Sequence, residues 1–305
     1  MSRSSASLPL PPVARRMDRV SSFLAMDVLS AAAAKERRGD SVIHMEVGQP
    51  SAPAPRLVRE AAKAALENGR IGYTEALGMA ALRERIARHY QDAYGVSLSP
   101  ERVVVTTGSS AGFVLAFLSL FDPGQRVAIT APGYPAYRNI LEALDLEPVI
   151  LPLTRADGWT MTARAVEKAH SEKPLHGILA MSPANPSGTM IGRNALAELG
   201  RTCRRLGLWF ISDEIYHGLT YGEPAATALA SDDDAIVINS FSKYYCMTGW
   251  RVGWVVVPER LVRPIERLAQ NLYISPPYLS QVAALASFDA LDELEAVKAG
   301  YARNR

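Results

Sequence analysis

Residues 235–257 read AIVINSFSKYYCMTGWRVGWVVV, and this stretch decides the fold class and the place where a ligand is expected. It begins and ends with a short apolar run that is rich in Val and Ile, as buried strands are. Between the runs lie Ser240, Lys243 and Arg251. A solvated surface lysine is one interpretation of Lys243. A lysine just beyond a strand-end serine, with an arginine eight residues later, instead predicts an anion-binding element.

Five similar apolar runs precede this stretch, and helical patterns separate them. The runs are RVVVTT, RVAIT, PVILPL, GILAMS and LWFIS, which begin at residues 102, 126, 148, 177 and 208. Strands that alternate with helices form mostly parallel sheets that are covered on both faces. The sequence therefore predicts an α/β fold in which a seven-stranded, mostly parallel sheet is buried between helices. Helices are expected over residues 19–38, 57–67, 79–94, 110–121, 134–143, 163–169 and 194–206.

The composition and the charge exclude several classes of protein. The chain has 305 residues, and 33 Lys and Arg against 31 Asp and Glu give a net charge of +2. A wholly disordered chain would be poorer in apolar residues than the 48% found here, and a protein built around nucleic-acid binding would carry a larger positive excess. The two cysteines, Cys203 and Cys246, are too few for a disulfide framework or a metal site. We therefore expect a reducing, cytoplasmic location and no metal.

Neither a membrane span nor a signal peptide is expected. The longest apolar stretch, residues 113–121, has nine residues and includes Ser119, whereas a membrane-spanning helix needs about 20. The first 16 residues contain arginines and three prolines but no apolar core of the kind that a signal peptide has. We interpret them as an N-terminal arm.

A glycine-containing turn follows the first apolar run. The sequence TTGSSAG holds Gly108, Ser109 and Ser110, and it leads into an apolar helix. Free backbone N–H groups and the positive end of the helix dipole make such a helix start suitable for an anion. The turn matches neither the nucleoside-triphosphate nor the dinucleotide glycine motif. It is therefore either a phosphate cup or a serine-rich helix cap.

Polar side chains also follow two of the central runs. After GILAMS comes PANPSGT, in which Asn185 is either an amide donor at the strand end or part of an ordinary Asn-Pro turn. After LWFIS comes DEIY, which contains Asp213 and Tyr216. A carboxylate at this position pairs with a cation or a metal unless it caps a helix. Because ligands bind beyond the carboxyl ends of parallel strands, these side chains are expected to face one ligand together with Lys243.

Pyridoxal 5′-phosphate is the cofactor that uses all of these groups. Its aldehyde needs a lysine amine, and its pyridine nitrogen needs a carboxylate that keeps the ring an electron sink. Its ring hydroxyl needs neutral donors, and its phosphate needs N–H groups, hydroxyls and a cation. Each motif is weak alone, but their presence in this order predicts a pyridoxal-phosphate site.

At this point the chain resembles the class I/II pyridoxal-phosphate-dependent aminotransferases of fold type I, the aspartate aminotransferase-like group, over about residues 20–305. The segment SFSKYYCMTGWRVGW resembles the lysine signature of that family. The resemblance implies that Lys243 carries the cofactor as a Schiff base and moves the proton at the substrate α-carbon. The residues that it places at the cofactor phosphate are Gly108, Ser109, Ser110, Ser240 and Arg251.

The resemblance also assigns residues to the cofactor ring. It implies that Asp213 pairs with the pyridine nitrogen, and that Tyr216 and Asn185 hydrogen-bond the ring hydroxyl, with Asn185 also close to the substrate. In PGYPAY it places Tyr134 against the face of the ring, although a packed aromatic at a helix start is the alternative.

Two further segments carry implications for assembly and for substrate binding. The segment GYTEALG resembles a loop whose tyrosine, here Tyr73, reaches the phosphate of the neighbouring subunit, which implies a homodimer. In VGQP the resemblance places the Gly48 N–H beside the substrate carboxylate, where a side chain would clash.

One departure from the family concerns the substrate carboxylate. The family binds it with an arginine far beyond the lysine, whereas 62 residues follow Lys243 here, and Arg303 and Arg305 are too near it in sequence to match. We expect that the C-terminal part of the small domain is missing. Residues 1–47 would form an arm and a small-domain segment, and residues 48–305 a large cofactor domain that ends near the start of the interdomain helix.

The function predicted from these features is an aminotransferase that moves an amino group between an L-amino acid and a 2-oxo acid. A β-lyase or an enzyme similar to aminocyclopropane-carboxylate synthase would use the same cofactor site, so these alternatives stay open. A truncated, inactive paralogue is a third possibility. The sequence does not separate aspartate, alanine, aromatic and branched-chain donors.

Overall fold

The computed structural model describes residues 11–305. Its centre is one sheet with the strand order β1-β7-β6-β5-β4-β2-β3. Strand β7 runs antiparallel to both of its neighbours, and the other neighbouring pairs are parallel, so the predicted seven-stranded, mostly parallel sheet is confirmed. The strands are β1 (Val103–Thr106), β2 (Arg126–Ala131), β3 (Glu147–Pro152), β4 (Gly177–Met181), β5 (Trp209–Asp213), β6 (Ile236–Ser240) and β7 (Gly253–Val256).

Helices surround the sheet, and each predicted helix overlaps an observed one. Those helices are α1 (Leu24–Glu36), α2 (Arg56–Glu67), α3 (Ala80–Tyr94), α4 (Ser109–Leu120), α5 (Pro135–Ala143), α6 (Ala163–Glu172) and α7 (Arg193–Leu206). Three helices after the last strand were not predicted, namely α8 (Glu259–Leu272), α9 (Tyr278–Ser287) and α10 (Leu291–Asn304). Short 3-10 helices are η1 (Arg15–Asp18), η2 (Pro100–Arg102), η3 (Ala228–Ala230) and η4 (Thr248–Trp250).

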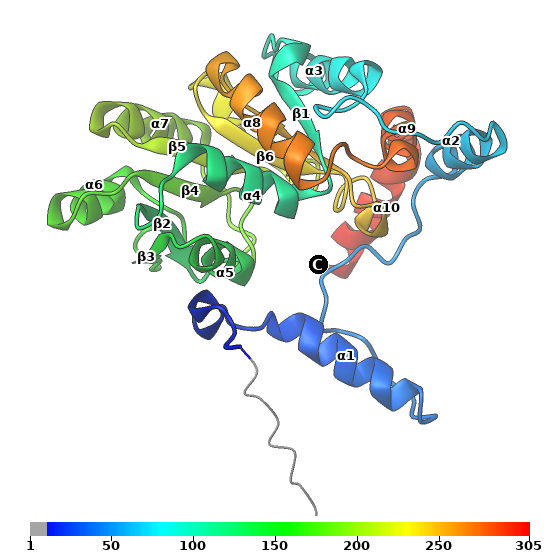
Figure 1. The fold of residues 1–305 in the computed structure, drawn as a ribbon, viewed down its shortest axis with the longest axis horizontal. Coiled ribbons are helices and arrows are strands. Elements are labelled where there is room, and N and C mark those ends of the chain that lie inside the picture. Colours follow the sequence, from blue (N-terminus) through cyan, green and yellow to red (C-terminus); the bar gives the residue numbers. More distant parts are fainter. Residues whose placement is uncertain (1–10) are drawn as a thin grey trace, which may run out of the picture.

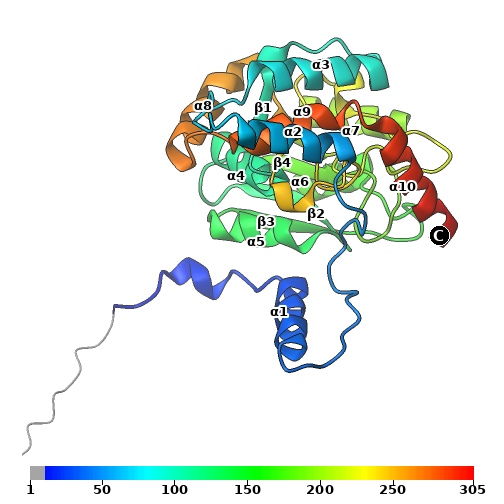
Figure 2. The ribbon, with the colours of Figure 1, turned by 90° about the vertical axis from the view of Figure 1, so that its right-hand side faces the viewer.

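Helices cover both faces of the sheet (Figures 1 and 2), and each face has its own hydrophobic core. Along β1, Val103 and Val105 point into the core that α2, α3, α6, α7 and α9 cover, whereas Val104 points into the core under α4, α5 and α8. This is the alternation that a strand imposes on its side chains. Both faces are apolar because both are covered, which explains the continuous Val and Ile runs in the sequence.

Strand β3 departs from the prediction that every strand is buried on both faces. It lies at the edge of the sheet and pairs with β2 alone. Ile150 is 42% exposed there, while its neighbour Leu151 is buried. An edge strand has one unpaired side, so its apolar run is covered less completely.

The N-terminal segment lies outside the layers of helices that cover the sheet and meets them beside α5. In both views η1 and α1 lie below the main body, and an extended segment joins α1 to α2 (Figures 1 and 2). The predicted helix over residues 19–38 begins only at Leu24, and Phe23 before it has an extended backbone. Ion pairs from Arg16 and Arg19 to Asp145 hold η1 beside α5. The proposed domain boundary at residue 47 stays a prediction.

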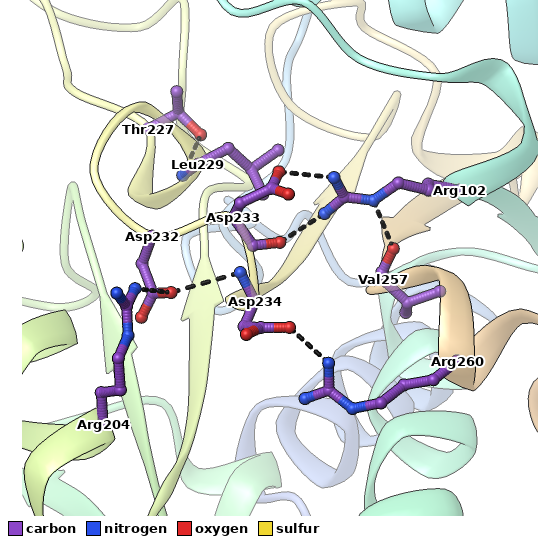
Figure 3. A network of polar contacts seen from close by, with 9 residues as sticks. All are labelled: Arg102, Arg204, Thr227, Leu229, Asp232, Asp233, Asp234, Val257 and Arg260. Carbon is purple, nitrogen blue, oxygen red and sulfur yellow. Dashed lines mark hydrogen bonds and ion pairs between the residues drawn. The ribbon is translucent and has the colours of Figure 1, made fainter.

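Three consecutive acids before β6 tie both helical layers to the sheet (Figure 3). Asp232 accepts a hydrogen bond from Arg204 of α7 at 2.7 Å, and Asp234 pairs with Arg260 of α8. Between them, Asp233 accepts a 2.5 Å hydrogen bond from Arg102 at the start of β1. Helices α7 and α8 lie on opposite faces, so this segment fixes the start of β6 between them. Lys243 follows the other end of the same strand.

None of the helices in residues 11–305 is long and apolar enough to span a bilayer.

Substitution of the first of these acids should cost more stability than substitution of the third. The Asp232 side chain is 6% exposed and also accepts the backbone N–H of Asp234, whereas the Asp234 side chain is 57% exposed. We expect Asp232→Ala to lower the free energy of unfolding by about 2–3 kcal/mol, because a buried hydrogen-bonded charge is lost, and Asp234→Ala by about 0.5 kcal/mol or less. Urea unfolding of the two variants measures this, and equal losses would contradict it.

Candidate active site

The carboxyl ends of β4, β5 and β6 open into a cavity of about 380 Å³. The register sets Met181 of β4 beside Asp213 of β5, and Asp213 beside Ile238 of β6. The turns that follow these strands therefore meet at one edge of the sheet, as expected for a parallel α/β fold. The cavity is lined by Phe23, Ala25, Glu46, Val47, Gly48, Ser109, Phe113, Tyr134, Pro135, Met181, Asn185, Asp213, Ile215, Tyr216 and Lys243.

Seven of the site residues predicted from the sequence line this one cavity. They come from six separate segments of the chain and are Gly48, Ser109, Tyr134, Asn185, Asp213, Tyr216 and Lys243. The other five predicted residues are not among its lining, namely Gly108, Ser110, Ser240, Arg251 and Tyr73. The first four belong to segments that adjoin the cavity, and Tyr73 lies elsewhere.

Gly108 and Arg251 form a close pair beside Ser109. Gly108 has a φ of +86°, a conformation that favours glycine, and a Cβ there would lie 2.6 Å from Nη2 of Arg251, so the guanidinium would have to move for any other residue. The backbone of Arg251 has a φ of +53°, in the left-handed region that non-glycine residues adopt uncommonly, where the chain leaves η4. No side chain caps the start of α4 at Gly108. The first N–H groups of the helix and the guanidinium thus form a cationic cradle.

Ser240 and Ser110 lie behind and beside this cradle. The buried Ser240 hydroxyl lies 3.0 Å from the Ser242 hydroxyl and 3.1 Å from the carbonyl oxygen of Val252, to which it donates. Ser240 therefore joins the end of β6 to the residue before β7. Ser110, on the first turn of α4, is exposed.

Lys243 reaches the cavity from the turn after β6. Its half-buried ammonium donates a 2.6 Å hydrogen bond to the carbonyl oxygen of Gly48, and it lies 5.7 Å from the centre of the Tyr216 ring. Burial lowers the pKa of Lys243, the nearby Arg251 lowers it further, and Asp213 opposes both. A lysine in this setting gives up its proton more readily than an exposed one.

Asp213 is buried at the end of β5 and held by two donors. The Tyr137 hydroxyl donates to Oδ2, and the backbone N–H of Ile215 donates to Oδ1 at 3.0 Å. Burial raises the pKa of Asp213 to about 6, although both hydrogen bonds act in the opposite direction. Tyr137, the second tyrosine of PGYPAY, was not among the residues predicted from the sequence.

Aromatic side chains form one wall of the cavity. Tyr134 precedes α5, and its ring meets the Phe23 ring edge-to-face at 5.7 Å and the Tyr137 ring at 5.2 Å. Phe23 comes from the extended residues before α1 and was also missed, because nothing in its local sequence marks it. The N-terminal segment thus closes one side of the cavity.

Asn185 and Tyr216 lie on the two turns that follow β4 and β5. Burial raises the pKa of the Tyr216 hydroxyl, nearby Asp213 and Tyr134 add to that shift, and the Asn185 side chain opposes it. The tyrosine is therefore a neutral donor at physiological pH. The same two residues also border a second cavity of about 480 Å³, which Tyr221 and Arg305 help to line.

Gly48 leaves room that no described protein atom fills. A Cβ built at this position has no heavy atom within 4 Å, so packing alone does not require glycine there. Two residues earlier, Glu46 also lines the cavity and hydrogen-bonds His44 with 2.7 Å between Oε1 and Nδ1. That contact lowers the pKa of Glu46. Glu46 was not among the predicted site residues.

Tyr73 does not line this cavity and belongs to a different one. Its side chain is 82% exposed, and it lies with Ile71 and Tyr278 in a depression formed by residues 69–75 and 79–81. Ile71 is exposed as well.

The family model for class I and II aminotransferases matches residues 40–305. The chain belongs to that family. This aminotransferase is 47% identical to the valine–pyruvate aminotransferase of Mycobacterium tuberculosis, over 93% of its own length and 74% of the relative. It is 34% identical to an arginine–pyruvate transaminase of Pseudomonas aeruginosa, over 92% of its length and 72% of the relative.

A solved structure agrees with the sequence comparison. The crystal structure of an aminotransferase from Mycobacterium tuberculosis superposes with a TM-score of 0.92 at 46% identity, covering 97% of this chain and 77% of that one. Enzymes of this family depend on pyridoxal 5′-phosphate and act on amino acids and 2-oxo acids, so the predicted fold class, cofactor and enzyme class are confirmed.

The residues around the cavity fit that cofactor. The cationic cradle of Gly108 and Arg251 suits a phosphate. Asp213 is a buried acid whose hydrogen bonds come from a hydroxyl and a backbone N–H, so its charge is available to a cationic ring nitrogen. A half-buried lysine faces the same space. These groups match the charges and donors that the cofactor needs.

Glu214, next to Asp213, is a second buried acid. Its Oε1 accepts hydrogen bonds from the Ser212 hydroxyl, the Thr227 hydroxyl and the Ala228 N–H at 2.8–3.1 Å. Its Oε2 is buried without a hydrogen-bond partner. Burial raises the pKa of Glu214 to about 7, and the three donors reduce the shift.

The pH dependence of stability should report this burial. Between the unfolded pKa of 4.5 and the folded pKa of about 7, the folded protein keeps a proton on Glu214 that the unfolded chain has lost. The stability that this proton contributes is complete below the unfolded pKa and is lost as the pH rises through about 7. We expect Glu214→Gln to remove about 1 kcal/mol of the decrease in unfolding free energy between about pH 6 and pH 8. Urea unfolding of cofactor-free protein at both pH values measures it.

The matched control is Glu198→Gln, on the exposed side of α7, which should keep the pH dependence of the unsubstituted protein. An unchanged pH dependence in Glu214→Gln would show that Glu214 does not hold the proton.

Proposed function

We propose that this aminotransferase holds pyridoxal 5′-phosphate through Lys243 and transfers the amino group of a neutral amino acid to a small 2-oxo acid such as pyruvate. The observation that carries the proposal is that seven of the residues predicted from the sequence, on six separate segments, line one cavity. The 47% identity to a valine–pyruvate aminotransferase supports the substrate class.

The bound cofactor would supply an electron-withdrawing ring that stabilises negative charge at the substrate α-carbon. Asp213 would pair with the ring nitrogen. Its pKa of about 6 leaves it ionised at neutral pH, and the Tyr137 hydroxyl and the Ile215 N–H fix its orientation. An ionised carboxylate at this place would keep a proton on the ring nitrogen.

The cradle at the start of α4 would bind the phosphate. Arg251 and the helix N–H groups supply the positive potential, and the hydroxyls of Ser109 and Ser110 add donors. In this proposal Gly108 allows the turn its φ of +86° and lets the guanidinium lie against the backbone. Ser240 would act at the phosphate as the sequence predicts, from the buried end of β6.

Lys243 would have two tasks. Its amine would hold the cofactor at the aldehyde carbon, with the aldehyde oxygen leaving as water, and it would move the proton at the substrate α-carbon. The lowered pKa of Lys243 favours the neutral amine that both tasks need. In the structure, the hydrogen bond from the Lys243 ammonium to the Gly48 carbonyl oxygen holds the lysine side chain in the lining of the cavity.

The remaining cavity residues would orient the ring and the substrate. Tyr216 and Asn185 would donate to the ring hydroxyl, and Tyr134 would pack against the ring face. The Gly48 N–H and Asn185 would lie beside the substrate carboxylate, a role that the open space around Gly48 supports.

The lining of the cavity favours a neutral substrate side chain. Among the described residues the lining includes no arginine, and its charged members are Glu46, Asp213 and Lys243. The proposal assigns Asp213 and Lys243 to the cofactor, so Glu46 is the charge left to meet the substrate. Its negative charge would repel a carboxylate on the substrate side chain, as distinct from the α-carboxylate beside Gly48 and Asn185. Phe23, Ala25 and Val47 would instead contact an aliphatic side chain.

The assembly and the domain limits are part of the same proposal. A homodimer would bring the exposed Tyr73 to the phosphate of the neighbouring site, and the exposed Ile71 would be covered in the same contact. Residues 1–47 would belong with the small domain and residues 48–305 with the large one. A cytoplasmic location remains the expectation from the two cysteines, both of which are free.

Replacement of the lysine tests the cofactor attachment. We expect Lys243→Ala to lower the transamination rate by roughly 10³-fold or more, because the amine is both the attachment point and the base. Borohydride reduction followed by mass spectrometry should attach cofactor to the unsubstituted chain at Lys243 and not to the variant. Lys173→Ala, at an exposed lysine paired with Glu147, should behave like the unsubstituted protein.

The choice of substrate and of reaction is tested with a panel of amino acids. With pyruvate as acceptor, L-valine should give alanine and a 2-oxo acid, while L-aspartate should react at least about tenfold more slowly because of Glu46. Release of ammonia without a 2-oxo acid acceptor would instead support an eliminating enzyme. Covalent cofactor without reaction on any amino acid would support an inactive paralogue.

A further inference from the structure

A buried polar cluster lies behind the wall of the cavity, and the function proposed above does not use it. It consists of Tyr94 at the end of α3 and of Glu214 and His217 on the turn after β5, and we call it the His217 cluster. The Tyr94 hydroxyl lies 2.8 Å from Nδ1 of His217. His217 Nε2 lies 3.1 Å from the carbonyl oxygen of Ser182, and Nδ1 lies 3.5 Å from Oε2 of Glu214.

The partners determine where the imidazole proton lies. Burial lowers the pKa of His217 to about 4, so the ring is neutral at physiological pH and carries one N–H. A carbonyl oxygen can only accept, and therefore Nε2 donates to Ser182. Nδ1 then accepts from the Tyr94 hydroxyl. Both ring nitrogens have a partner in this arrangement, and the ring orientation is fixed from two sides.

Ser182 is the first residue after β4, and it begins the turn that carries Asn185. Its N–H donates to the carbonyl oxygen of Asp213 at 3.1 Å, and its hydroxyl accepts from the Ile191 N–H at 2.9 Å. The His217 bond engages its third polar group. The start of the Asn185 turn is therefore tied directly to the turn that holds Asp213 and Tyr216.

We propose that His217 is a positioning residue of the cofactor site, which fixes the Asn185 turn against the Tyr216 turn by bridging Tyr94 and the Ser182 carbonyl oxygen. The inference rests on the proposed function, in which Asn185 and Tyr216 donate to the same ring hydroxyl. Two donors on separate turns can reach one atom only if the spacing of the turns is held to within about 0.5 Å. His217 touches neither cofactor nor substrate in this proposal.

Two variants of His217 separate the loss of both of its hydrogen bonds from the loss of the bond to Tyr94 alone. His217→Leu removes both hydrogen bonds and leaves the Ser182 carbonyl oxygen without its donor. His217→Gln keeps a side-chain N–H that can donate to the same oxygen. The readouts are the dissociation constant for pyridoxal 5′-phosphate and the pH midpoint of the visible absorbance change of the bound cofactor, which responds to donors at the ring hydroxyl.

We expect His217→Leu to weaken cofactor binding roughly tenfold and to shift the absorbance midpoint, because the ring hydroxyl loses one of its aligned donors. His217→Gln should bind within about threefold of the unsubstituted protein. Asp232→Ala, whose loss of stability arises at the opposite end of β6, should change neither readout, and it serves as the control for a general loss of stability.

If His217→Leu does not fold, Tyr94→Phe carries the test, since it removes only the hydroxyl bonded to Nδ1. An absorbance midpoint shifted in the same direction would support the bridge. Unchanged binding and midpoint in Tyr94→Phe or in His217→Leu would overturn it and leave His217 with a purely structural role. A failure of the proposed function is recognised separately, because borohydride would then attach no cofactor to the unsubstituted chain.

Discussion

The parallel pairing of β4, β5 and β6 is the constraint on which the rest of the site depends. It brings three turns that are distant in sequence to one edge of the sheet, with Met181 beside Asp213 and Asp213 beside Ile238. A change of register by one residue would turn each strand's side chains to the opposite face. The two separate cores on either face of the sheet resist such a shift. The acids before β6 add to this resistance, because they hold the start of the strand to both layers.

A second requirement is that the buried carboxyl group in the cavity can still interact with a ligand although it is shielded from solvent. Two adjacent carboxyl groups, Asp213 and Glu214, follow the central strand, and burial raises the pKa of both. They have different surroundings. Asp213 accepts two hydrogen bonds and opens into the cavity, whereas Glu214 faces away from it, with one oxygen saturated and the other next to a neutral histidine. One acid is therefore available to a ligand, and the other is part of the support behind it.

The sequence predicted the sheet, and seven of the residues that it marked line one cavity, for physical reasons. Strands covered on both faces must be continuously apolar, so β1 and β6 stand out, and polar residues directly after such runs, like Lys243, are conspicuous. Supporting residues have no such signal. Tyr137 was one of two tyrosines in a short motif, and only the path of α5 shows that it meets Asp213. Phe23 and His217 depend on contacts between segments more than 30 residues apart, which local patterns cannot reveal.

The hydrogen bond between Lys243 and Gly48 has a consequence for how this site tolerates genetic change. The acceptor is a backbone carbonyl oxygen, so no substitution at position 48 deletes it, whatever side chain is introduced. The anchor can be lost only if the segment that carries it moves. The acceptor for the amine is thus encoded by the path of the chain and does not depend on which side chain occupies position 48.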